Sequence, residues 1–243
     1  LLDLVTRTAA NDEYVSAWYR ATATMLQSWA DHAELQPHLE RGLARFPDDP
    51  ALLVIEGTVH ARFAGPLFQP FGSATTVPGS TSGIQSADDE RLAAEASFRA
   101  ALKIDPTLDE ARVRLGDVLG ADGQHANALD QLDVALTRPL PAALHYDAWL
   151  IAGREEEAVG RRADARAAYQ SAMALYPHAR TARLALSRIL REAGDRDGAA
   201  HALDELVDPS LSIDTDPWWL YDETHWPGAR DLLAGLGRVL EAK

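Results

Sequence analysis

A pattern of small and apolar residues in the segment 109–142 recurs before and after it along the 243-residue chain. Leu115, Val118 and Leu119 are three and four residues apart, which places them on one face of a helix. Gly116 lies inside this helix, where glycine costs about 1 kcal/mol relative to alanine, so it indicates the close approach of another backbone. A second helix is predicted after a turn, with an apolar stripe formed by Ala128, Leu132 and Ala135. The segment therefore predicts two tightly packed antiparallel helices.

The same pattern occurs twice downstream, at offsets of 37 residues and then a further 34 residues. It also fits twice upstream, where the second copy carries 25 extra residues between its two helices. A single helix pair cannot bury its outer face, so neighbouring pairs must stack into one continuous core. The downstream copies are carried by Trp149, Ala152, Gly153, Gly160, Ala165, Tyr169, Ala172 and Pro177, and by Arg183, Leu186, Ser187, Leu190, Gly194, Ala199 and Leu203.

A 34-residue helical period with Gly/Ala seams and a closing proline resembles the tetratricopeptide repeat family over roughly residues 14–212. The resemblance implies an all-α, right-handed α-solenoid of about five helix–turn–helix repeats within residues 1–212. Residues 213–243 would form an aromatic C-terminal capping segment.

In that family the first helix of each repeat lines the concave side of the solenoid. This resemblance would place six charged residues in a partner-binding groove: Arg114, Asp117, Arg154, Glu157, Arg188 and Arg191. The arginines could bind acidic groups of a partner, because guanidinium binds carboxylates bidentately. Alternatively, each arginine pairs with an acidic neighbour inside the groove. The Lys/Asn pair with which some family members clamp a peptide C-terminus is missing at these positions.

The extra residues of the second repeat, 63–87, contain no charge, four glycines and three prolines, which disfavours a regular helix or strand over most of them. Insertions between paired helices often project near the binding face of a solenoid. We expect either a Phe-rich loop that contacts a partner or a segment that folds back onto the local groove. The predicted contact residues of the loop are Phe63, Leu67, Phe68 and Phe71.

Three of the six tryptophans lie within nine residues near the C-terminus, in a motif that reads Asp-Pro-Trp-Trp-x-Tyr. Asp216 followed by Pro217 predicts an N-cap and first helical position. The motif resembles the tail of some bacterial tetratricopeptide proteins. Its aromatic residues predict either a cap over the last repeat or an adhesive patch. They are Trp218, Trp219, Tyr221 and Trp226.

The formal net charge of −14, from 37 acidic and 23 basic residues, disfavours sequence-independent binding to nucleic acid, which requires positive charge against phosphates. The absence of cysteine excludes disulfides and thiolate metal sites. No apolar run reaches the ~18 residues that a membrane span requires. The chain begins at Leu1 without methionine, which indicates either a processed product or a fragment; of the two locations, we expect export rather than the cytoplasm.

Neither a metalloprotease HExxH motif nor a P-loop nor a dinucleotide fingerprint occurs. Asp222, Glu223 and His225 could in principle ligate a metal, but three such residues are common in a polar turn, so we expect no metal and no cofactor. The sequence predicts a non-enzymatic protein–protein interaction scaffold that binds a protein or peptide through the groove and the Phe-rich loop. The alternative is a self-assembling structural subunit, a head-to-tail homopolymer or filament whose contacts are the loop and the Trp-rich tail.

Overall fold

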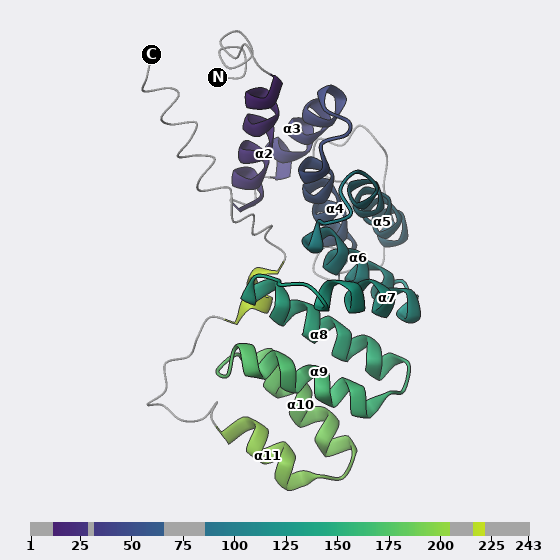
Figure 1. Ribbon diagram of the computed structural model, residues 1–243, viewed down its shortest axis with the longest axis vertical. Coiled ribbons are helices and arrows are strands. Elements are labelled where there is room, and N and C mark those ends of the chain that lie inside the picture. The colour runs from purple at the N-terminus through teal and green to yellow at the C-terminus, as the bar shows by residue number, and fades with distance from the viewer. Residues whose placement is uncertain (1–11, 29–31, 66–85, 205–215, 222–243) are drawn as a thin grey trace. The chain divides into compact units, whose positions relative to one another are not determined.

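The computed structural model describes residues 12–28, 32–65, 86–204 and 216–221, and the regular structure among them is entirely helical. These residues form two compact units (Figure 1). Unit 1 comprises the described residues up to Pro106, and unit 2 is Thr107–Tyr221. The predicted all-α fold built from helix pairs is confirmed.

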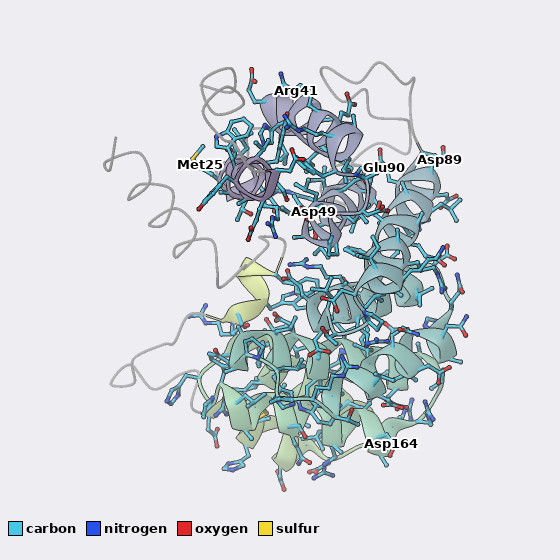
Figure 2. All side chains as sticks on the ribbon, turned by 45° about the horizontal axis from the view of Figure 1, so that its top comes forward. Met25, Arg41, Asp49, Asp89, Glu90 and Asp164 are labelled. Atoms are coloured by element: carbon cyan, nitrogen blue, oxygen red, sulfur yellow. The ribbon has the colours of Figure 1, made fainter. Side chains whose placement is uncertain are left out.

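Unit 1 contains two helix pairs, α2 (Asp12–Ser28) with α3 (His32–Arg45) and α4 (Pro50–Ala64) with α5 (Ala87–Ile104). Asp49 caps α4 by accepting hydrogen bonds from the N–H groups of Ala51 and Leu52, at 3.1 and 3.2 Å. Ser86 and Asp89 form a reciprocal capping box that fixes the start of α5. Asp49 and Asp89 are labelled in Figure 2.

Small residues set the distance between paired helices in both units, as Gly116 predicted. A Cβ atom on Gly57 would lie 2.7 Å from the ring of Phe98, and one on Gly153 would lie 2.5 Å from the ring of Tyr169. Either position therefore excludes any larger side chain while the facing ring stays in place.

Phe63 occupies the last turn of α4, where its side chain is 7% exposed in the core of unit 1. It packs with Leu52, Ile55 and Val59. The prediction that Phe63 belongs to a partner-binding loop is therefore wrong, because burying this ring in the core removes it from the surface. Leu67, Phe68 and Phe71 lie outside the described residues.

Unit 2 contains three further helix pairs, stacked in chain order (Figure 1). The first helix of each pair is followed by a short turn and a second, antiparallel helix. A 3₁₀ turn, η1, follows later in the chain and packs mainly on α8. The pairs are α6 (Asp109–Ala121) with α7 (His125–Leu136), α8 (Ala142–Ala158) with α9 (Arg162–Leu175), and α10 (Arg180–Glu192) with α11 (Arg196–Asp204); η1 is Pro217–Leu220.

The turn inside each pair of unit 2 has the same backbone conformation. Gly123, Gly160 and Gly194 have φ angles of 78°, 80° and 86°, which a residue with a side chain adopts at a cost. In each turn the N–H of the residue after the glycine donates a hydrogen bond to the carbonyl five residues before it. This hydrogen bond is typical of helices that end at a glycine. The recurrence of this turn explains the regular spacing of glycine in the sequence.

Candidate functional site

The first helices of unit 2 are linked by ion pairs between residues that the sequence analysis placed on one face. Asp117 of α6 accepts a hydrogen bond from Arg154 of α8, with 2.7 Å between Oδ1 and Nη2. Glu157 of α8 likewise accepts from Nη2 of Arg188 in α10 at 2.5 Å. Four of the six predicted groove residues are thus paired with one another across neighbouring repeats.

Further partners hold these charges in place. Arg154 also donates from Nε to Oε1 of the buried Glu155, at 2.6 Å. Burial alone would lower the pKa of Arg154, but the carboxylates of Asp117 and Glu155 outweigh it and the pKa rises. Glu157 receives a second hydrogen bond, from the hydroxyl of Tyr169 at 2.5 Å. Arg154 and Arg188 therefore already bind carboxylates within the chain.

The other two predicted groove arginines differ from each other. Arg191 is exposed and makes no ion pair with the part of the chain that the structure describes. Arg114 is buried, and its Nε donates to Oε1 of Glu110 at 3.0 Å. Its guanidinium carbon lies 4.8 Å from the centroid of the Tyr221 ring, a cation–π contact. The chain's own C-terminal region therefore covers Arg114.

Residues 216–221, which we call the anchored segment, are held at one end by the carboxylate of Asp216. Its Oδ2 accepts hydrogen bonds from both the N–H and the hydroxyl of Thr181, at 2.7 Å each. Its Oδ1 accepts from the N–H of Trp218 at 3.1 Å, which caps η1. Thr181 lies in the first turn of α10, where the helix dipole favours a negative charge.

The aromatic residues of the anchored segment pack on α6 and α8. The rings of Trp218 and Tyr221 are stacked, with 5.0 Å between their centroids and 8° between their planes. Tyr221 belongs to an apolar cluster that includes Val113 of α6 and Ile151 of α8. Tyr221 thus contacts the first helices of the third and fourth repeats, and Trp218 also packs against an apolar cluster that includes Leu186 of the last repeat. The cap over the last repeat stays a prediction. The side chain of Trp219 and all of Trp226 lie outside the described residues.

Two buried polar atoms beside the anchored segment have no hydrogen-bond partner among the residues that the structure describes: Oδ1 of Asp147 and the hydroxyl oxygen of Tyr221. The Asp147 side chain, on α8, is 5% exposed. Burial raises its pKa to about 7; the charge of Arg114 opposes this shift, and those of Asp216 and Asp117 add to it. Burial, followed by the charge of Asp117, also raises the pKa of Tyr221. Asp147 and Tyr221 are thus polar groups that are buried without all the hydrogen bonds they could make, which is uncommon in folded proteins.

Sequence reasoning missed Asp147 and Thr181. Nothing in the local sequence pairs Thr181 with Asp216, 35 residues away, and Asp147 resembles any acidic residue of an acidic chain. The signal that was present is the Asp-Pro pair, which predicted a capped turn at residue 216.

The anchored segment is held by hydrogen bonds, a cation–π contact and apolar packing. Among the described residues, no group of three or more histidine, aspartate or glutamate side chains could hold a metal ion. None of the helices within those residues is long and apolar enough to cross a membrane. The first helices offer two hydrogen-bond donors of Thr181 to a carboxylate and the guanidinium of Arg114 to an aromatic ring. Apolar side chains of α6 and α8 pack against the same ring.

No protein-family profile and no curated protein sequence matches the chain. Solved structures of tetratricopeptide repeat proteins do match it. MamA from Desulfovibrio magneticus RS-1 is 19% identical, with a TM-score of 0.62 over 85% of this chain and 100% of that one. YrrB, described as a TPR protein with an unusual peptide-binding site, is 16% identical, with a TM-score of 0.57 over 85% and 90%.

PilF from Pseudomonas aeruginosa gives a TM-score of 0.63 at 14% identity, over 95% of this chain and 92% of its own. At such identities the likeness concerns the fold. It confirms the tetratricopeptide-repeat solenoid predicted from the sequence.

Proposed function

We propose that this protein is a non-enzymatic protein–protein interaction scaffold, and that the first-helix surface of unit 2 binds short peptide segments of its partners. We define the first-helix surface as the part of α6, α8 and α10 that contacts the anchored segment. One observation carries the proposal: six consecutive residues of the chain, 216–221, already lie on this surface as a peptide ligand would.

The contacts are of the kind that bind peptides. A carboxylate is bound by a backbone N–H and a hydroxyl, both supplied by Thr181, near a helix N-terminus. An aromatic ring lies against the guanidinium of Arg114. Aromatic residues and arginine dominate the energetics of protein interfaces. YrrB, which has a similar fold, is described as having a peptide-binding site, and this agrees with the proposal.

A labelled peptide copying residues 214–223 tests the proposal directly. The surface is first vacated in the full chain by the double variant Asp216→Ala with Tyr221→Ala. We expect fluorescence anisotropy to show saturable binding, abolished when Arg114→Ala and Thr181→Val are added. A vacated chain that keeps its helical circular dichroism but does not bind at millimolar peptide would refute the proposal.

A second candidate function is self-assembly by exchange of the anchored segment between copies. The surface and its occupant belong to one chain and are joined by the eleven residues 205–215, so a second copy can supply identical contacts. Light scattering over a hundredfold concentration range tests this. Assembly that the double variant Asp216→Ala with Tyr221→Ala abolishes would support exchange, and a strict monomer would rule it out.

Leu67, Phe68, Phe71, Trp219 and Trp226 remain proposed partner contacts. Substituting Phe68 and Phe71 with serine should weaken binding of a partner protein without affecting binding of the 214–223 peptide. An unchanged affinity for that partner would remove the loop from the proposal.

A further inference from the structure

We infer that the preferred ligand of the first-helix surface is a peptide of the form Asp-Pro-aromatic-x-x-Phe, and that the chain's own anchored segment is a weaker version of it that such a ligand displaces. This inference rests on the proposed function and specifies its ligand class. It follows from three features of the bound segment: its acid, its spacing and its last residue.

The acid is required because it satisfies several donors at once. The Asp216 carboxylate is 4% exposed and accepts from the N–H and the hydroxyl of Thr181 and from the N–H of Trp218. Charged acceptors form hydrogen bonds about twice as strong as neutral ones. The dipole of the 13-residue helix α10 adds to the preference for a negative charge. An amide in place of the carboxylate loses the charge and leaves the donors poorly paired.

The spacing follows from the geometry of η1. A 3₁₀ helix has three residues per turn, so residues 218 and 221 project from the same side. Their rings stack at 5.0 Å, and the second ring contacts Arg114. Pro217 occupies the first helical position, where its fixed φ favours the turn before binding. A ligand therefore needs an aromatic residue two positions after its acid and another one five positions after it.

A ligand can bind more tightly than the anchored segment if it differs at the last residue, Tyr221. Tyr221 is 9% exposed, and its hydroxyl has no hydrogen-bond partner within the described part of the chain. Burying an unpaired hydroxyl costs free energy, whereas the contact with Arg114 needs only the ring. Phenylalanine keeps the ring and removes the hydroxyl. We expect a peptide with phenylalanine at this position to bind roughly tenfold more tightly than the natural sequence.

A segment that belongs to the same chain as its site competes for that site at an effective concentration of about millimolar. The unpaired hydroxyl weakens this internal competitor. The anchored segment then protects the surface in the free protein and yields to a ligand that binds more tightly.

Three labelled peptides test the ligand class on the vacated full chain, Asp216→Ala with Tyr221→Ala. The first copies residues 214–223, the second has asparagine in place of the Asp216 equivalent, and the third has phenylalanine in place of the Tyr221 equivalent. A scrambled peptide of the same composition is the control. We expect the asparagine peptide to bind at least tenfold more weakly than the first, and the phenylalanine peptide roughly tenfold more tightly.

The same substitution of tyrosine by phenylalanine, made in the chain itself, gives an independent measurement. Tyr221→Phe should strengthen the internal segment, so the natural peptide should compete several-fold less well for this variant than for the wild type. The single variant Tyr221→Ala replaces the double variant if the latter loses its helical circular dichroism. Equal affinities for the tyrosine and phenylalanine peptides, or for the asparagine and aspartate peptides, would overturn the ligand class. Failure of all three peptides to bind a folded, vacated chain would instead overturn the proposed function.

Discussion

Gly120 of α6 leaves the space that the carboxylate of Glu155 of α8 occupies, since a Cβ atom on Gly120 would overlap that carboxylate. Glu155 is 1% exposed and is held by Arg154 and by Nδ1 of His125, at 2.6 and 2.7 Å. A neighbouring repeat thus places a buried charge at a position where only glycine fits. The substitution Gly120→Ala should therefore destabilise the protein by about 2 kcal/mol, although alanine favours a helix, because overpacking outweighs helix propensity. Thermal unfolding should show a midpoint lower by several degrees.

The control for this prediction is the same substitution in a Glu155→Ala background. There the methyl group meets no carboxylate, and Gly120→Ala should be neutral or stabilising by up to about 1 kcal/mol. An equal loss in both backgrounds would show that the carboxylate is not the cause.

Asp147 should make stability depend on pH. Its pKa is about 7 in the folded chain and 3.8 in the ordinary unfolded state, so the folded chain binds more protons between these values. Stability should therefore fall as pH rises from about 4 to 7 and stay low above 7. Asp147→Asn removes this slope and should stabilise the protein above pH 7 by roughly 1 to 3 kcal/mol. The charges that face Asp147 are those of Arg114, Asp117 and Asp216.

Urea unfolding at pH 5 and pH 8 measures this effect. The matched control is Asp130→Asn, which removes an exposed carboxylate of α7 and should change stability equally at both pH values. If Asp147→Asn and Asp130→Asn gave the same difference between pH 5 and pH 8, Asp147 would not be the responsible group.

The repeat pattern predicted the fold because the features that repeat are local. Gly116 and Gly153 are seam positions readable from spacing alone, and the structure places a large side chain against each. The resemblance to the tetratricopeptide repeat family also implied that the first helices share one face, where Asp117 and Arg154 meet although they are 37 residues apart.

The anchored segment could not be predicted in the same way. Its contacts join residues of no fixed spacing, such as Thr181 with Asp216 and Arg114 with Tyr221, and they depend on the path of the chain after α11. The motif itself identified the capped turn, but an apolar motif at the end of an array predicts a cap as readily as an internal ligand. Phe63 was misassigned for a related reason: an uncharged, Phe-containing sequence does not reveal where the preceding helix ends.

The three turn glycines of unit 2 should each contribute about equally to stability. A Cβ atom at Gly123, Gly160 or Gly194 would meet nothing within 4 Å, so substitution strains only the backbone. Alanine at any one of them should cost about 1 kcal/mol, and asparagine, which tolerates this conformation better, should cost less. Thermal unfolding of the six single variants measures whether the three positions contribute equally and whether alanine costs more stability than asparagine. Alanine and asparagine variants of equal stability would contradict the backbone explanation.

Removing the Asp216 carboxylate should release the anchored segment while the helix pairs remain folded. The variant Asp216→Ala loses the acceptor for Thr181 and for the Trp218 N–H, so the segment loses its anchor and its cap. Because hydrogen bonds to charged groups contribute about 1.5 to 3 kcal/mol, the amide of Trp218 should exchange with solvent at least tenfold faster. Hydrogen exchange measured by mass spectrometry on peptides covering 216–221 and α8 distinguishes local release from global unfolding. Release predicts loss of protection in 216–221 with α8 unchanged, and Asp130→Ala should change neither. If α8 lost protection in parallel with the segment, the segment would be part of the folding core of unit 2 rather than a displaceable ligand of it.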